Sequence, residues 1–270
     1  MSRIAERYQR ALITGAGSGL GKAFATRLIR EGVEVWGTSR KPENLEPSDR
    51  FRPIQLDLVS EPDLGEWFER WERESGGFDL VINNAGLGVL APVEKLRNTD
   101  IITQIQVMLS GPILLATHSF SVLRAGKKGC LVNVSSMAGV LPIPFLSVYN
   151  ATKAGLSAFS QSIMMEAPKD PPWVIDFLPG DYDTAVNRNM KKLHMDSKDC
   201  NRVWHRLEEL MSEAPQTEKA ADDLIRALKK FRHCTCTSGS FVQTSIASWL
   251  RRLSPATLQR KILRRYYRLP

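Results

Sequence analysis

The amino-acid sequence predicts an α/β fold, a doubly wound parallel sheet with helices on both faces. Short apolar segments typical of buried strands alternate with longer segments of helical periodicity along most of the chain. The chain has 270 residues and is 43% hydrophobic, which is enough to bury one substantial core. A glycine-rich segment lies where the first strand passes into the first helix. We therefore assign residues 1–248 to a single domain and residues 249–270 to a C-terminal extension.

The predicted elements can be placed in order along the chain. In the first helix the apolar residues Leu20, Phe24 and Leu28 share one face, and Gly32 lies just past its end, where glycine often terminates a helix. The expected strands are Ala11–Thr14, Val33–Gly37, Phe51–Leu56, Leu80–Ile82, Cys130–Val134 and Val174–Leu178. The expected helices are Gly19–Glu31, Pro62–Glu74, Thr99–Leu123, Val148–Glu166 and Thr217–Phe231.

Charge and cysteine content exclude several classes of function. Seven cations of the extension, residues 249–270, account for most of the formal net charge of +8, so nucleic-acid binding is not indicated. The cysteines, Cys130, Cys200, Cys234 and Cys236, lack the spacing of a metal site, so we expect reduced thiols and no metal. The N-terminal residues do not resemble a signal peptide, and charges or prolines interrupt every apolar run before the roughly 18 residues of a membrane span. We expect a cytoplasmic protein.

The glycine-rich segment predicts a dinucleotide site. A pyrophosphate needs backbone N–H groups aimed at it and no Cβ in the way, and the positive end of a helix dipole stabilises its charge. A glycine-rich turn without function is the alternative, but its place between strand and helix favours nucleotide binding. The residues expected to form this loop are Thr14, Gly15, Gly17, Ser18, Gly19, Leu20 and Gly21.

The end of the second strand predicts which dinucleotide binds. NAD-binding folds usually place an acid there to hold the ribose 2′-hydroxyl, whereas this chain has Ser39 and Arg40. A guanidinium and a hydroxyl can bind a 2′-phosphate that a carboxylate would repel. The alternative is that Arg40 and Lys41 lie in a solvated loop. We expect NADP(H) to be preferred over NAD(H).

The pair Tyr149 and Lys153 suggests the chemistry. The two residues are four apart at the start of a helical segment and so share one face. A nearby ammonium favours the phenolate of tyrosine, whose ordinary pKa is about 10, and such a tyrosine can exchange a proton with a carbonyl or an alcohol. Taken alone, such a pair is more often an ordinary helix-surface contact.

Several motifs in order give the chain a resemblance to the short-chain dehydrogenase/reductase family, in its compact single-domain branch with a Rossmann fold. The resemblance covers residues 9–230. It rests on the glycine-rich loop, on Tyr149 with Lys153, and on four further segments, which are Asp57-Leu58, Asn83-Asn84-Ala85-Gly86, Ser135-Ser136, and Pro179-Gly180 with Thr184.

The resemblance implies a role for each of these residues. Ser136, thirteen residues before Tyr149, would hydrogen-bond the substrate oxygen, Tyr149 would exchange the proton, and Lys153 would bind the nicotinamide ribose and lower the pKa of the tyrosine. The other implied cofactor contacts are Asp57, Leu58, Asn84, Ala85, Gly86, Pro179, Gly180 and Thr184.

One residue departs from the family pattern. Met108 lies where the family usually has an asparagine that helps hold a water linked to the lysine. A thioether cannot donate the hydrogen bonds of an amide, although the backbone carbonyl of Met108 still can accept one. We expect activity to survive this change.

The sequence indicates less about the residues that contact the substrate and about the placement of the C-terminal extension. Met137, Val140, Leu141, Ile143, Phe145 and Leu146 would line an apolar cleft for a hydrophobic carbonyl or alcohol, or else pack in the core. The extension predicts a basic amphipathic helix with Leu258, Ile262, Tyr266 and Leu269 on one stripe. That helix could dock over the cleft, which we favour, or contact an anionic membrane peripherally.

Two further expectations concern assembly and function class. The resemblance implies a homodimer or homotetramer formed through the helices Thr99–Leu123 and Val148–Glu166. The alternative function is an NADP(H)-binding redox-reading regulator or scaffold with weak or no catalysis.

Overall fold

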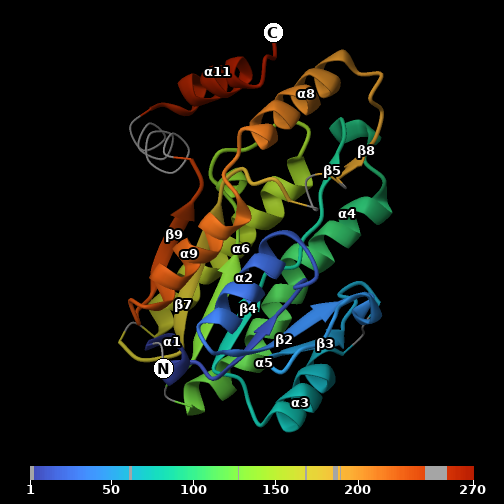
Figure 1. The fold of residues 1–270 in the computed structure, drawn as a ribbon. Coiled ribbons are helices and arrows are strands. Elements are labelled where there is room, and N and C mark those ends of the chain that lie inside the picture. The colour runs from blue at the N-terminus through green and yellow to red at the C-terminus, as the bar shows by residue number, and fades with distance from the viewer. Residues whose placement is uncertain are drawn as a thin grey trace.

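A parallel sheet lies at the centre of the protein (Figure 1). The computed structural model describes residues 3–60, 63–126, 128–167, 169–184, 188, 190–240 and 254–270, and within these ranges seven strands form the sheet. The strand order is β3-β2-β1-β4-β6-β7-β9, and every pairing is parallel. The strands are β1 (Arg10–Ile13), β2 (Glu34–Ser39), β3 (Phe51–Gln55), β4 (Leu80–Asn83), β6 (Cys130–Val134), β7 (Trp173–Pro179) and β9 (Cys234–Ser238). The doubly wound fold predicted from the sequence is confirmed.

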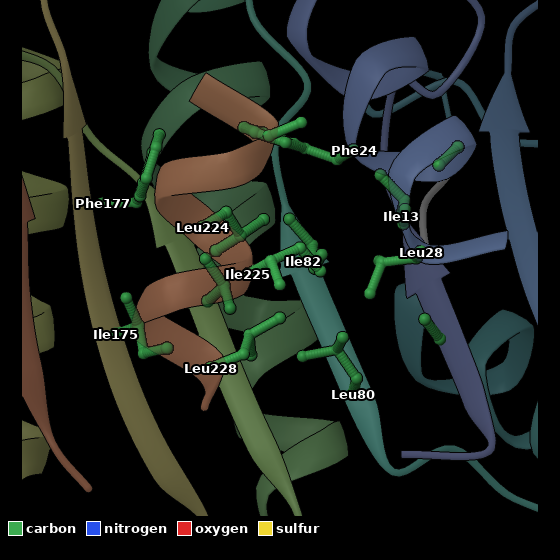
Figure 2. Packing of buried hydrophobic residues seen from close by; sticks show 14 of the residues in the cluster. Ile13, Phe24, Leu28, Leu80, Ile82, Ile175, Phe177, Leu224, Ile225 and Leu228 are labelled. Atoms are coloured by element: carbon green, nitrogen blue, oxygen red, sulfur yellow. The ribbon is translucent and has the colours of Figure 1, made fainter. Parts of the chain in front are cut away.

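Helices cover both faces of the sheet because successive residues of each strand point to opposite sides. On one face, Ala11 and Ile13 of β1 pack with α2 (Gly19–Arg30) and α9 (Thr217–Leu228). Figure 2 shows this layer, with Phe24 and Leu28 of α2 and Leu224, Ile225 and Leu228 of α9 over the sheet. On the other face, Leu12 packs with α3 (Leu64–Ser75), α5 (Gly111–Ala125) and α6 (Ser147–Glu166).

The helix expected over Thr99–Leu123 is interrupted. It consists of α4 (Asn98–Ile105), a π-helical turn (Gln106–Ser110) and α5. The turn contains Met108, the residue that departs from the family pattern. Pro112, in the first turn of α5, has no N–H to donate to the preceding turn, which is consistent with the change in hydrogen-bond register.

The stretch Asn98–Ala125 is long and apolar enough to cross a bilayer by length and composition, which corrects the expectation that every apolar run is too short. In the fold it packs against α3, α6 and the sheet, and Leu115, Ala116 and Leu123 lie in the core. The stretch is therefore partly buried in the fold, with 39% of its most apolar window inside it.

Several elements were not expected from the sequence. They are α1 (Arg3–Arg7), the two-stranded pair β5 (Val89–Leu90) and β8 (Lys191–Lys192), α8 (Lys198–Ser212) and the edge strand β9. Strand β9 was missed because its sequence, Cys-Thr-Cys-Thr-Ser, has none of the long aliphatic residues of the other strands. The start of the helix expected over Pro62–Glu74 lies outside the described residues, and this helix, α3, is described from Leu64.

The C-terminal helix is present as α11 (Ala256–Tyr266). Figure 1 shows α8 and α11 at the end of the molecule opposite the N-terminus. The boundary drawn between residues 248 and 249 lies outside the described residues. The four cysteines are free, as expected.

Candidate functional site

A single cavity of about 730 Å³ contains most of the residues that the sequence singled out. It lies at the carboxyl ends of the sheet strands, where α/β sheets bind their ligands. Three predicted residues, Thr14, Gly19 and Gly21, do not line it. The predicted residues that do are Gly15, Gly17, Ser18, Leu20, Ser39, Arg40, Asp57, Leu58, Asn84, Ala85, Gly86, Ser136, Tyr149, Lys153, Pro179, Gly180 and Thr184.

Thr14 and Asn84 hold the glycine-rich loop in place. The Thr14 hydroxyl accepts hydrogen bonds from the backbone N–H groups of Asn84 (2.9 Å) and Ala85 (3.0 Å). In return, the Asn84 amide donates to the carbonyls of Thr14 (2.9 Å) and Gly15 (3.3 Å). The turn after β1 is thereby fixed to the end of β4.

Glycines are required in this loop for two separate reasons. Gly15 and Gly19 have φ of +68° and +52°, a region that residues with a Cβ rarely adopt. Gly21 is needed for space, since a Cβ there would lie 2.2 Å from the Gly15 carbonyl oxygen and 2.5 Å from the Asn84 amide nitrogen. The result is a backbone cradle at the N-terminus of α2, which fits the pyrophosphate of a dinucleotide.

The ribose region of the cavity is lined by Ser39, Arg40, Lys41 and Asn44. Ser39 Oγ accepts a hydrogen bond from the Lys41 N–H at 3.1 Å, and the Arg40 side chain is exposed. Nearby, the Asp57 carboxylate accepts from the Val59 N–H at 3.0 Å. The donor groups at this end suit a phosphate bound beside a ribose.

The three residues expected to do the chemistry come together at the middle of the cavity. Ser136 follows β6 and its hydroxyl accepts from the Ala138 N–H at 3.0 Å. Tyr149 lies in the first turn of α6 and is hydrogen-bonded by Ser136. One turn later, the Lys153 amine lies 6.0 Å from the centroid of the Tyr149 ring and donates to the Val134 carbonyl at 2.7 Å.

Burial dominates the electrostatics of this group. It raises the pKa of Tyr149 above its ordinary value, with a smaller opposite effect from the Ser136 hydrogen bond and a further rise from the charge of Asp181. Burial also lowers the pKa of Lys153 to about 8, although the carboxylate of Asp176 opposes this shift. The sequence led us to expect a tyrosine pKa lowered by Lys153, whereas the amine is directed at a backbone carbonyl and burial determines the pKa of Tyr149.

Asp176 was missed by sequence reasoning. This residue of β7 is fully buried, and its carboxylate accepts hydrogen bonds from Ser135 (2.6 Å), Ser157 (2.5 Å) and Gln161 (3.3 Å). The sequence feature that could have revealed Asp176 is a single acidic residue within an otherwise apolar strand. The Ser135 hydroxyl is thus engaged beneath the site, which leaves Ser136 as the serine that contacts Tyr149.

Apolar side chains form the far end of the cavity, as expected in part. Met137, Leu141, Ile143 and Leu146 line it, whereas Val140 and Phe145 do not. Further lining residues come from α8, which was not expected as a helix, and from the region of α11, which was expected to dock over the cleft. They are Trp204, Leu207, Met211, Ile262, Leu263, Tyr266 and Tyr267.

The C-terminal helix docks on α8 and covers this end of the cavity. Arg268 donates to both carboxylate oxygens of Glu209 at 2.8 and 2.7 Å, and the Arg206 guanidinium lies 5.1 Å from the Tyr266 ring centroid. Tyr267 is 6% exposed and shares an apolar cluster with Leu146, Trp204 and Tyr149. Of the two placements considered for this helix, the structure shows the docked one.

Comparisons with known proteins agree with this architecture. The family model described as short chain dehydrogenase matches residues 9–194. A 3-ketodihydrosphingosine reductase of Bacteroides thetaiotaomicron is 31% identical over 221 residues, which cover 81% of this chain and 74% of that protein.

Two solved structures share the fold. A short-chain dehydrogenase from Streptomyces avermitilis has a TM-score of 0.79 at 24% identity, covering 96% of this chain and 98% of that one. A short-chain dehydrogenase from Sphingobium yanoikuyae, solved in complex with NADPH, has a TM-score of 0.70 at 20% identity, covering 94% of each chain.

Proposed function

This chain belongs to the short-chain dehydrogenase family, and on that premise we propose that it transfers a hydride between NADP(H) and a hydrophobic carbonyl or alcohol. The observation that supports the proposal is the convergence of Ser136, Tyr149 and Lys153 in one cavity, between a dinucleotide cradle and an apolar chamber. A regulator that only senses the redox state of NADP(H) would need the glycine-rich cradle, but it would not need Ser136, Tyr149 and Lys153 to lie together.

The residues at the centre of the cavity suit proton transfer to a carbonyl oxygen. The bound nicotinamide supplies the hydride for reduction. Because its pKa is raised, Tyr149 holds its proton and donates it only as negative charge develops on the substrate oxygen. The Ser136 hydroxyl, hydrogen-bonded to Tyr149, is placed to bind the same oxygen. Lys153, buried beside them, supplies positive charge to the site.

Cofactor preference is proposed from the ribose region. Ser39 and Arg40 line the cavity there. A guanidinium and a hydroxyl favour a 2′-phosphate, so NADP(H) is the preferred cofactor.

The test is NADPH consumption with long-chain ketones, including 3-ketodihydrosphingosine, the substrate named for the Bacteroides relative. Tyr149→Phe should lower kcat by roughly 10²- to 10⁴-fold, because it removes the proton donor. NADPH binding, followed by fluorescence, should persist in the variant. Tight NADPH binding without turnover by the wild-type protein would favour the regulator instead.

The proposed enzyme pairs with a second copy through its long helices. Large apolar side chains are exposed there, on α4 (Ile102 and Ile105), α5 (Leu114) and α6 (Met165). Such side chains gathered on adjacent helices are typical of a protein interface. Light scattering should give a dimer or tetramer, and Ile102→Asp with Leu114→Asp should give a monomer.

The outer face of α11 contacts anionic lipid in this proposal. Leu258 is exposed and absent from the described cavity lining, and the cations Arg260, Lys261 and Arg265 are exposed on the same helix. Flotation with phosphatidylglycerol vesicles should weaken when these three cations are replaced by glutamate. Equal flotation of both proteins would contradict the lipid contact and leave the oxidoreductase proposal standing.

A further inference from the structure

Three buried polar side chains form a hydrogen-bonded chain behind one wall of the cavity. They are Tyr182, which follows β7, Ser238, the last residue of β9, and Asp223 of α9. Tyr182 lines the cavity, whereas Ser238 and Asp223 are absent from its described lining. The hydrogen-bonded chain therefore connects the wall of the cavity to the helix layer outside it.

The direction of these hydrogen bonds follows from the groups that form them. The Ser238 hydroxyl donates to the Asp223 carboxylate at 2.6 Å. A serine hydroxyl has one proton to donate, so Tyr182 is the donor in its contact of 2.6 Å with the Ser238 hydroxyl. The hydrogen bonds thus run from the phenol of Tyr182 through Ser238 to Asp223.

Two cations hold the Asp223 end in place. The Asp223 carboxylate forms ion pairs with Lys219 at 2.9 Å and with Arg226, both on the same helix. Hydrogen bonds to an ionised group are stronger than those between neutral groups, and exclusion of water strengthens them further. Because Ser238 is fully buried, its hydroxyl is a strong link between Tyr182 and α9.

Ser238 also holds the neighbouring backbone. Its carbonyl accepts from the Gly180 N–H at 2.7 Å, where the chain leaves β7. We call residues 179–184 the wall segment, because most of them line the cavity. Ser238 therefore contacts the wall segment at two points, with its carbonyl at Gly180 and with its hydroxyl at Tyr182.

The wall segment lies beside the residues proposed to do the chemistry. The Pro179 carbonyl accepts from the Ser136 hydroxyl at 3.5 Å, and Ser136 is hydrogen-bonded to Tyr149. The glycine-rich cradle lies after a different strand, at the N-terminus of α2. The wall segment would thus hold the nicotinamide end of a bound cofactor, and the cradle its pyrophosphate. A shift of the wall segment would misplace the hydride donor without loosening the pyrophosphate.

We propose that Ser238 is a positioning residue for hydride transfer, which holds the wall segment through Tyr182 and is itself held by Asp223. This inference rests on the proposed function and adds to it a residue outside the cavity. Because Ser238 acts through Tyr182, removal of either hydroxyl should have the same consequence.

The experiment removes single hydroxyl groups from the full chain. Ser238→Ala and Tyr182→Phe each delete the hydrogen bond between these two residues, and both leave the backbone contact of Gly180 in place. With NADPH and 3-ketodihydrosphingosine, each variant should lower kcat by roughly 10- to 100-fold, the scale on which small misplacements act. The Kd of NADPH should not change, since the cradle is untouched.

Two further readouts separate positioning from a general loss of stability. The fluorescence decay of bound NADPH, measured without substrate, should become faster in both variants, because a nicotinamide ring that is held less firmly loses its excitation sooner. The variant with both changes should lose no more kcat than the weaker single variant, because both changes remove one and the same hydrogen bond.

Ser119→Ala is the matched control. Ser119 of α5 is fully buried like Ser238, and its hydroxyl donates to the Ala116 carbonyl at 3.3 Å within its own helix. It is absent from the described cavity lining. The control loses a buried serine hydroxyl far from the wall segment, so kcat and the fluorescence decay should stay as in the wild-type protein.

Several results would overturn the inference. Unchanged kcat and fluorescence decay in Ser238→Ala, or in Tyr182→Phe should Ser238→Ala not fold, contradict the positioning role and leave the proposed function intact. Losses of kcat that add up in the double variant, or a matching rise in the Kd of NADPH, contradict it as well. No turnover of any long-chain ketone by the wild-type protein overturns the proposed function and this inference together.

Discussion

The two ends of the cavity are built in different ways. The cofactor end consists of backbone turns held by specific hydrogen bonds, as in those of Thr14 with Asn84 and Ala85. The substrate end is made of packed apolar side chains, such as Leu146, Trp204 and Tyr267. One end therefore depends on the identity of a few residues, whereas the other depends on packing that many apolar residues can provide. Substitutions at the two ends should therefore differ in how strongly they act and in whether they change cofactor binding, stability or the KM for the substrate.

The largest effect is expected at the glycine-rich loop. Gly21→Ala places a methyl group 2.2 Å from the Gly15 carbonyl oxygen, so the loop must move. The free energy of unfolding should fall by about 1–3 kcal/mol, the usual range for overpacking, and NADPH binding should be lost. Gly126→Ala is the control, because a Cβ there meets only ordinary contacts at 3.8 Å. Thermal unfolding and fluorescence titration measure both effects, and normal NADPH affinity in Gly21→Ala would contradict the cradle.

A more selective effect is expected at the ribose region. Arg40→Ala should weaken NADPH binding by about 10- to 100-fold, since a charge-assisted hydrogen bond is lost, and leave NADH binding nearly unchanged. Arg70→Ala, on the surface of α3, supplies a control with the same change of charge. The ratio of the two dissociation constants is the measurement. Equal weakening of both cofactors would show that Arg40 does not read the 2′-phosphate.

Lys153 lies between the two ends of the cavity, and the pH dependence of kcat/KM should follow the titration of its amine. Its pKa of about 8 means that the amine loses its proton as the pH rises through that value, so kcat/KM for reduction should decline there. Asp176 raises this pKa, so Asp176→Asn should move the decline to lower pH. A pH profile of kcat/KM for both proteins tests the shift. A decline at the same pH in both would remove Asp176 from the electrostatics of the site.

The smallest effect is expected at the covering helix. Arg268 and Glu209 form an exposed ion pair, and such pairs contribute little. Arg268→Ala should therefore raise KM for a hydrophobic ketone by less than about fivefold, with NADPH affinity unchanged. Arg202→Ala, which removes another exposed pair of α8, should not change KM. A large loss of kcat in Arg268→Ala would mean that the ion pair affects the reaction and does not only hold α11 against α8.

The same contrast explains what could be predicted from the sequence. Gly15, Gly21 and Arg40 could be singled out because a glycine-rich turn, or a charge at a strand end, is visible in a few consecutive residues. Asp176 and the individual residues of α8 could not, because their contacts depend on pairing between distant strands and on packing against α11. Helix α8 buries Cys200, Val203, Trp204 and Leu207 on one side, and the partner of that side depends on the tertiary fold. Likewise, the spacing of Tyr149 and Lys153 indicated a shared face and not the dominance of burial over their pKa values.

The cluster that joins Tyr149 to α8 and α11 links access to reactivity. Tyr149 packs in the same apolar cluster as Trp204 and Tyr267, which line the far end of the cavity. A substitution that loosens this cluster should therefore shift the phenol of Tyr149 as well as the cavity wall, so the shape of the chamber and the position of its tyrosine cannot be changed independently.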